Sequence, residues 1–102
     1  MKSIWIAVLL AVNAIIVDAQ FELTGTVEDD SGQAMIGANV YIGKTFQGAT
    51  TDLNGRYSIR NLPAGNYEIS ASYMGYETGL KNIDLQGDME LSFILAPRVE
   101  ND

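Results

Sequence analysis

The chain has 102 residues with no cysteine and no histidine, and its 13 acidic against 6 basic residues give a formal net charge of −7. The lack of cysteine excludes disulfides and a lipid-anchored lipoprotein, while the lack of histidine removes the usual general base and the commonest ligand of catalytic zinc. Nucleic acid is an unsuitable partner, because its affinity comes from clustered lysine and arginine and the basic residues here are scattered.

The first twenty residues have the pattern of an export signal. Lys2 supplies a positive start and the segment Ile4 to Val17 is almost wholly apolar, so we predict a signal peptide at residues 1–19, cleaved before Gln20. The alternative is a retained membrane anchor, which needs about 20 apolar residues, whereas this run is shorter and is interrupted by Asn13. Export to the periplasm, the outer membrane or the medium follows from the signal.

Beyond residue 20 the apolar positions follow a period of two, the pattern of half-buried β-strands. The first such segment places Phe21, Leu23, Gly25 and Val27 on one side, and turn-forming residues at 29–32 end it. Two short strands are predicted next, at residues 39–42 and 49–51, with a loop at 43–48 between them.

Asp52 to Gly55 forms the next predicted turn, and Tyr57 and Ile59 alternate with polar residues after it. Residues 61–66 are expected to form a loop, because Pro63 cannot donate a hydrogen bond to a sheet. The clearest inward face then consists of Tyr67, Ile69, Ala71 and Tyr73.

Gly75 is expected to break that strand, and one further strand follows it. Leu80 and Ile83 have opposite parity within it, which predicts a β-bulge near Lys81 and Asn82. A change of parity without a bulge would put one set of apolar side chains in water.

A last alternating segment at residues 89–95 completes six or seven short strands, and no helical periodicity is found after residue 20. Strands of this length, separated by turns about every 8–12 residues, are typical of a two-sheet sandwich or a small barrel. We therefore predict an all-β fold, a seven-stranded antiparallel β-sandwich over residues 20–97, with a polar tail at 98–102.

The turn residues, taken in order, resemble the carboxypeptidase regulatory-like domain family. The resemblance spans most of residues 21–96 and rests on Gly25-Thr26-Val27, Ser31-Gly32, Gly37-Ala38-Asn39-Val40, Thr51-Asp52-Leu53-Asn54-Gly55-Arg56-Tyr57, Leu62-Pro63-Ala64-Gly65-Asn66-Tyr67 and Gly75-Tyr76. It implies a transthyretin-like (prealbumin-like) β-sandwich. In Bacteroidetes-type bacteria such a domain commonly forms the N-terminal extension of TonB-dependent outer-membrane receptors for nutrient uptake, including receptors that import glycans.

The leading hypothesis is therefore a non-catalytic, exported accessory module at the periplasm or outer membrane, without a cofactor. Its implied partner is a protein of the cell envelope, such as the plug or barrel of a receptor, and it would meet the membrane only through the signal peptide or that receptor. The alternative is a secreted carbohydrate- or peptide-binding module, and a metal-dependent enzyme fragment is the third hypothesis. Both a fragment of a receptor and a free-standing copy remain open.

Tyr41 is the candidate binding residue, because its neighbours Val40 and Ile42 occupy the interior and its own ring must face outward. An incidental surface tyrosine is the competing interpretation. The turn residues Asp52 and Asn54, with the carboxylates Asp29 and Asp30, could attract calcium, or could serve only to form hydrogen-bonded turns. Three tyrosines at inward parity are expected in the core: Tyr57, Tyr67 and Tyr73.

Overall fold

The computed structural model describes residues 19–45 and 47–99, so the signal peptide predicted at residues 1–19 lies almost wholly outside the described part. Within that part no helix is long and apolar enough to cross a membrane. The strands found there are β1 (Gln20–Asp29), β2 (Asn39–Ile42), β3 (Gly48–Thr50), β4 (Arg56–Pro63), β5 (Gly65–Ser72), β6 (Gly79–Leu85), β7 (Met89–Glu90) and β8 (Phe93–Leu95).

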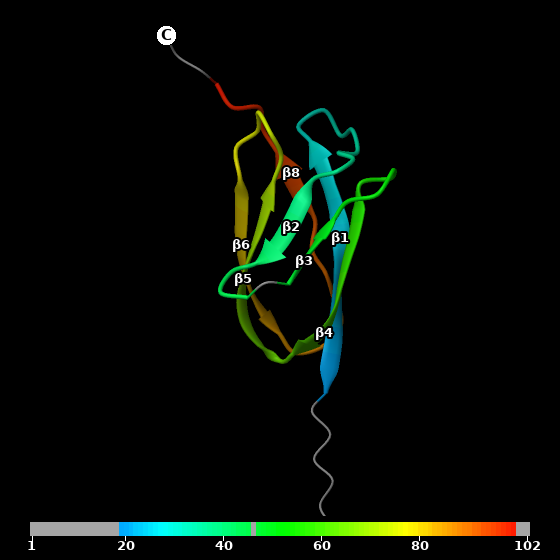
Figure 1. The fold of residues 1–102 in the computed structure, drawn as a ribbon, viewed down its shortest axis with the longest axis vertical. Helices are drawn as coiled ribbons and strands as arrows, with labels where there is room; N and C mark the ends of the chain where they lie inside the picture. The colour runs from blue at the N-terminus through cyan, green and yellow to red at the C-terminus, as the bar shows by residue number, and fades with distance from the viewer. Residues whose placement is uncertain (1–18, 46, 100–102) are drawn as a thin grey trace, which may run out of the picture.

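The strands form two sheets that lie face to face (Figure 1). Sheet I has the order β4-β1-β7, with β8 also paired to β1, and sheet II has the order β3-β2-β5-β6. All pairs in sheet II and the β1–β4 pair are antiparallel, whereas β7 and β8 run parallel to β1. The predicted β-sandwich is confirmed, with eight strands rather than seven and with two parallel pairs.

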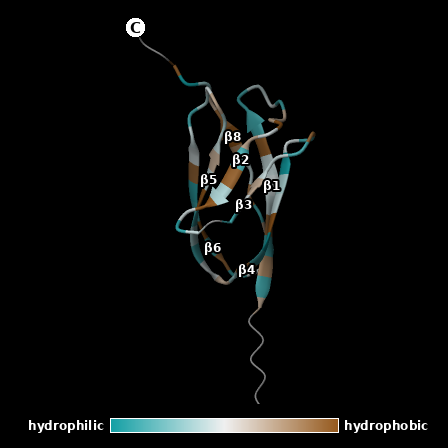
Figure 2. Cartoon of the chain, viewed as in Figure 1, coloured by the Kyte–Doolittle hydropathy of each residue, from teal (hydrophilic) through white to brown (hydrophobic). Residues whose placement is uncertain are grey.

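The core lies between the two sheets and collects the inward residues of both. Hydrophobic and hydrophilic segments alternate along the strands (Figure 2), as the period of two requires. Burying one such apolar side chain contributes roughly 1.5–3 kcal/mol, so this layer is the main source of stability. The largest fully buried side chains are Phe93, Leu23, Ile42, Leu62, Ile69, Leu85, Leu95, Val27 and Val40.

The prediction of a loop at residues 61–66 is wrong. β4 continues to Pro63, and β5 begins two residues later. Pro63 is tolerated because β4 is an edge strand and because Pro63 pairs with Gln20, the first residue of β1. Asn61 adopts a positive φ of 63°, and the register shifts there, which returns Leu62 to the core.

The β-bulge predicted near Lys81 and Asn82 is also wrong, since β6 pairs with β5 in an unbroken antiparallel register. Leu80 faces outward, and Lys81 takes the inward side of the strand. A lysine can occupy this position because its apolar stem covers protein surface while its ammonium reaches a polar partner. Here the ammonium lies 5.2 Å from the centre of the Phe93 ring and donates to the Ser92 carbonyl.

The tyrosines expected in the core differ in their burial. Tyr57 is buried and Tyr67 is partly buried against the core, as expected, but Tyr73 is exposed, so the expectation was wrong for Tyr73. β5 ends at Ser72, which leaves Tyr73 beyond the paired part of the sheet. Its ring instead meets the edge of Tyr76, with 5.7 Å between the ring centres.

Candidate interaction surfaces

Tyr41 lies on the outer face of sheet II, as its parity predicted. It pairs with Gly48 of β3 on one side and with Ser70 of β5 on the other, and Ser70 in turn pairs with Leu80 of β6. Tyr41 and Leu80 are 44% and 61% exposed, yet Ser70 between them is only 7% exposed. Tyr41, Ser70 and Leu80 therefore form one register row, called the strip below, in which two exposed apolar side chains flank a buried serine across three strands.

The positions next to this strip carry small neutral polar groups. Asn39 pairs with Thr50 and with Ser72, and the Thr50 hydroxyl donates to the Asn39 side-chain oxygen at 3.4 Å. The nearest charged strand residue on this face is Glu68 of β5, which lies on the other side of the strip. The half of the face around Tyr41 is therefore uncharged and well suited to a neutral partner.

A groove of about 550 Å³ lies beside the strip on the same face of sheet II. Its floor follows two further register rows, in which Glu68 pairs with Asn82 and Asn66 pairs with Asp84. The loop after β2 closes one side, because the Gly43 N–H donates to the Glu68 carbonyl at 2.9 Å. The lining residues are Gly43, Lys44, Asn66, Tyr67, Glu68, Asn82, Ile83 and Asp84.

A second surface lies at one end of the sandwich, where the loops after β1, β3 and β5 meet and where the C-terminal tail leaves (Figure 1). Met74 and Leu53 are 94% and 79% exposed at the tips of two of these loops, and Ile36 and Val99 are also exposed. Exposed apolar side chains are common singly, but several at one end of a small domain indicate a contact surface.

Backbone hydrogen bonds hold the loops of this apolar end in place. The Arg98 N–H donates to the Gly75 carbonyl at 2.8 Å and the Glu77 N–H to the Ala96 carbonyl at 2.9 Å, which ties the tail to the loop after β5. The Thr51 hydroxyl donates to the Met35 carbonyl at 2.5 Å. These bonds hold the tail against the loop after β5 and the loop after β3 against the loop after β1.

The turn carboxylates are engaged in their own turns. Asp29 Oδ1 accepts from the Ser31 hydroxyl at 2.7 Å and from the Gln33 N–H at 2.9 Å, and Asp52 Oδ1 accepts from the Asn54 and Arg56 N–H groups at 2.9 Å. The Ser31 hydroxyl lowers the pKa of Asp29 most, and the Arg56 N–H does so for Asp52. These contacts support the turn interpretation of both residues.

No group of three or more Asp, Glu, His or Cys suitable for a metal ion gathers within residues 19–45 and 47–99. Tyr57 is also occupied, because its hydroxyl donates to the Leu91 carbonyl. Burial, and to a lesser degree the Glu90 carboxylate, raises the pKa of Tyr57 above its ordinary value. Tyr57 is thus a structural hydrogen-bond donor.

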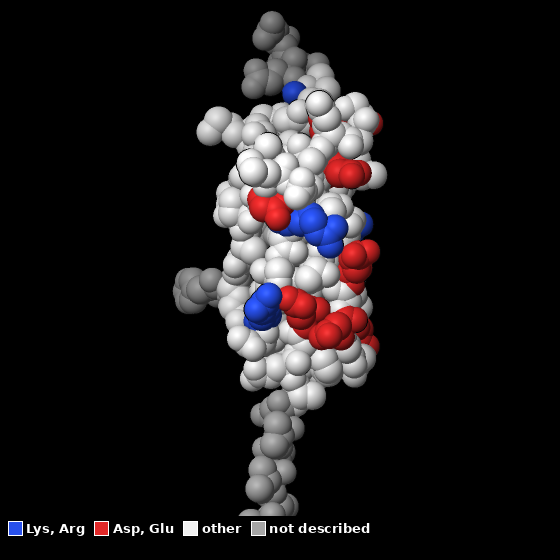
Figure 3. All heavy atoms as spheres, turned by 90° about the vertical axis from the view of Figure 1, so that its right-hand side faces the viewer, with Lys and Arg blue, Asp and Glu red and all other residues white. Residues whose placement is uncertain are grey.

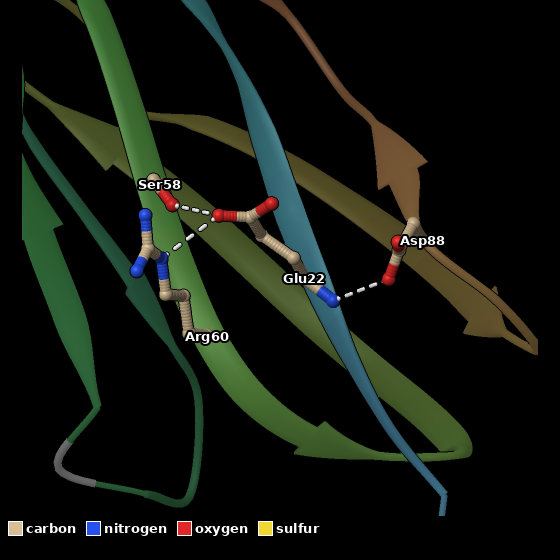
Figure 4. Close-up of polar contacts among 4 residues, drawn as sticks. All are labelled: Glu22, Ser58, Arg60 and Asp88. Atoms are coloured by element: carbon tan, nitrogen blue, oxygen red, sulfur yellow. Dashed lines mark hydrogen bonds and ion pairs between the residues drawn. The ribbon is translucent and has the colours of Figure 1, made fainter.

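The outer face of sheet I carries charges of both signs. Acidic and basic atoms lie side by side down this face (Figure 3). Figure 4 shows one such group, in which Glu22 Oε2 accepts from the Ser58 hydroxyl at 2.7 Å and from Arg60 Nε at 3.0 Å, while the Glu22 N–H donates to Asp88. Exposed ion pairs contribute about 0–1 kcal/mol, and the interleaved signs produce no single-sign field for a polyanion.

Sequence reasoning placed the Tyr41 side chain on the outside of the sandwich but missed the groove beside it and the apolar end. Leu53 lies inside the turn Asp52–Gly55 and Met74 directly before Gly75, so the turn composition dominated the interpretation of both. The sequence did contain a signal for an exposed apolar surface, because a turn is not stabilised by a large apolar side chain at its centre.

A family model described as the CarboxypepD_reg-like domain matches residues 23–101. TonB-dependent receptor P39 of Formosa agariphila is 43% identical over 61 residues, which are 60% of this chain and 6% of the receptor. TonB-dependent receptor P3 of the same organism is 27% identical over 96 residues, 93% of this chain and 9% of the receptor. The chain thus spans less than a tenth of the length of either relative.

Among solved structures, one chain of a type II cohesin–X-dockerin complex from Acetivibrio cellulolyticus has a TM-score of 0.68 and 24% identity. The match covers 76% of this chain and 58% of the other. At this identity the likeness shows the sandwich fold and carries no function across.

Proposed function

The chain belongs to the CarboxypepD_reg-like domain family, as its turn residues indicated, and on that premise we propose that it is the exported accessory module of a TonB-dependent outer-membrane receptor. The module would be residues 20–97, preceded by the signal peptide at 1–19, and would lie on the periplasmic side as the N-terminal domain of such a receptor or as a free-standing copy beside one. The relatives with receptor names support the class of protein, and their names denote receptors rather than enzymes.

The observation that carries the proposal is the apolar end of the sandwich. Leu53 and Met74 expose large apolar side chains at the end where the tail leaves β8. A domain that continued into a receptor would meet its neighbour at that end first. Burying one such side chain in the neighbour would contribute about 1.5–3 kcal/mol, so that two or three suffice to fix the module against it.

The mechanism is positional. The described part begins at one end of the long axis and its last residues leave at the other (Figure 1), with two packed sheets between them. Such a body holds whatever precedes it and whatever follows it at a fixed separation. The docked end transmits that position to the plug or barrel, and no bond is made or broken.

Removal of residues 20–97 from the intact receptor tests this function. The expected result is loss of substrate uptake and a changed pattern of envelope partners, with the receptor still present in the outer membrane. Unchanged uptake, together with an unchanged pattern of envelope partners, would show that the module has no accessory role.

A further inference from the structure

The outer face of sheet II has a strip and a groove that the receptor proposal leaves unused. The strip consists of Tyr41, Ser70 and Leu80, paired across β2, β5 and β6. Because neighbouring strands lie about 4.8 Å apart, the strip spans roughly 10 Å, which is wider than one sugar ring. The backbone pairing of β2, β5 and β6 fixes the positions of all three residues, so the strip is present in the fold without a ligand.

The groove supplies the polar half of a binding site. Asn66, Glu68, Asn82 and Asp84 all project from the same face as the strip, and all four are exposed. A side-chain amide both donates and accepts, and a carboxylate accepts from two directions, so that this set can bond adjacent hydroxyl groups of one ring. Small-molecule sites usually combine an apolar surface with a few polar groups beside it.

The charges of the groove select the class of ligand. Its lining contains two carboxylates, Glu68 and Asp84, and one cation, Lys44. A uronate or sulfated chain would be repelled by this balance, and a purely apolar ligand would leave the amides and carboxylates without partners. An extended peptide would bind by pairing its backbone with a sheet edge and would not need the face of the sheet.

We propose that the outer face of sheet II binds a neutral polysaccharide, whose rings stack on Tyr41 and Leu80 and whose hydroxyls bond Glu68, Asn82 and Asp84. The aromatic face of Tyr41 meets the apolar C–H face of a sugar ring, and the carboxylates and amide fix the orientation of the ring. This site is separate from the apolar end, so the module can hold a glycan while it is docked on a receptor.

Electrophoresis of the purified protein in native gels that contain a soluble neutral polymer tests the proposal. Starch, galactomannan and mixed-linkage β-glucan are the neutral probes, alginate is the anionic probe, and an unstructured peptide is added as competitor. We expect at least one neutral polymer to retard the protein and alginate not to do so. Tyr41→Ala and Asn82→Ala should each weaken binding about tenfold, while Tyr41→Phe retains it because the ring is kept.

The melting temperature of each variant is measured alongside, so that lost binding is not confused with unfolding. Ile94→Ser serves as the matched control, since Ile94 is an exposed apolar residue on the outer face of sheet I and its loss should leave retardation unchanged. Retardation by no neutral polymer, retardation by alginate alone, displacement by the peptide, or full binding by Tyr41→Ala would overturn the proposal. A result of this kind leaves the receptor function standing, because that function depends on the apolar end.

Discussion

The ammonium of Lys81 donates a hydrogen bond of 2.6 Å to the carbonyl oxygen of Ser92. This contact joins β6, the edge strand of sheet II, to the segment between β7 and β8 in sheet I. An inward lysine on an edge strand also hinders pairing with another molecule, because its charge would be buried in a continued sheet. The Lys81 side chain therefore links the two sheets at this edge and disfavours pairing of the edge with a second molecule.

Replacing Lys81 tests this closure. Lys81→Ala should lower the free energy of unfolding by about 1 kcal/mol, because it loses the hydrogen bond and the contact with the Phe93 ring. Lys81→Met keeps the apolar stem and should lose less. Urea unfolding measures both, and Arg98→Ala, at an exposed residue of the tail, is the control. Equal stability of all three variants and the parent would contradict the role given to Lys81.

Thr51 is a buried polar residue with two hydrogen bonds that fix the loop after β1. Its hydroxyl donates to the Met35 carbonyl at 2.5 Å and accepts from the Ala38 N–H at 2.8 Å. Thr51→Val keeps the shape but leaves both backbone groups unpaired, so we expect a loss of about 2–3 kcal/mol in urea unfolding. Thr50→Val, on the exposed neighbour, should stay within about 0.5 kcal/mol. A neutral Thr51→Val would show that the loop does not depend on this clamp.

Gly25 gives the segment between β7 and β8 room to lie against β1. A Cβ at Gly25 would lie 1.8 Å from the Leu91 carbonyl oxygen, and the Leu91 N–H donates to Thr24 at 2.7 Å. Gly25→Ala should therefore cost at least about 3 kcal/mol or prevent folding. Gly87→Ala is the matched control, because nothing lies within 4 Å of its added methyl group. Thermal unfolding compares them, and a Gly25→Ala variant as stable as the control would refute the close approach.

The two turn aspartates predict how stability changes in acid. Hydrogen bonds within the turns hold the pKa of Asp29 and Asp52 below the ordinary value of 3.8. A lowered pKa in the folded state contributes stability above the unfolded pKa, and that contribution disappears as the pH falls through the folded pKa. The urea concentration at the midpoint of unfolding should thus decrease when the pH is lowered below about 4. This decrease should be smaller in the double variant Asp29→Asn, Asp52→Asn. Midpoints that stay constant down to pH 2.5 would argue against this contribution.

The first two strands of the described part could be predicted because alternation there matches burial residue by residue, whereas the single strand predicted at residues 89–95 is divided into β7 and β8. Leu23 and Val27 are buried as the period of two requires, and Val40 and Ile42 flank the outward Tyr41. Lys81 misled the prediction of β6, because a charged residue at an inward position makes the regular parity look interrupted. Pro63 misled the prediction of the β4–β5 connection, since only the position of β4 at the sheet edge makes a proline acceptable there.

The candidate surfaces were harder to predict than the strands. The outward ring of Tyr41 followed from its neighbours, but the burial of Ser70 depends on which residues are paired across β2, β5 and β6. That pairing is a long-range relationship, and no local pattern contains it. The apolar end likewise forms only when three loops and the tail meet at one end of the fold.

The central claim is that the module docks through its apolar end. The most direct measurement is a site-specific cross-link from residue 75 to the remainder of the intact receptor, made in the parent and in the double variant Leu53→Ser, Met74→Ser. Ile94→Ser, at an exposed apolar residue on the outer face of sheet I, is the matched control. We expect the double variant to lose at least about tenfold in cross-link yield and in uptake while the control keeps both. A double variant that cross-links and imports like the parent would contradict the claim.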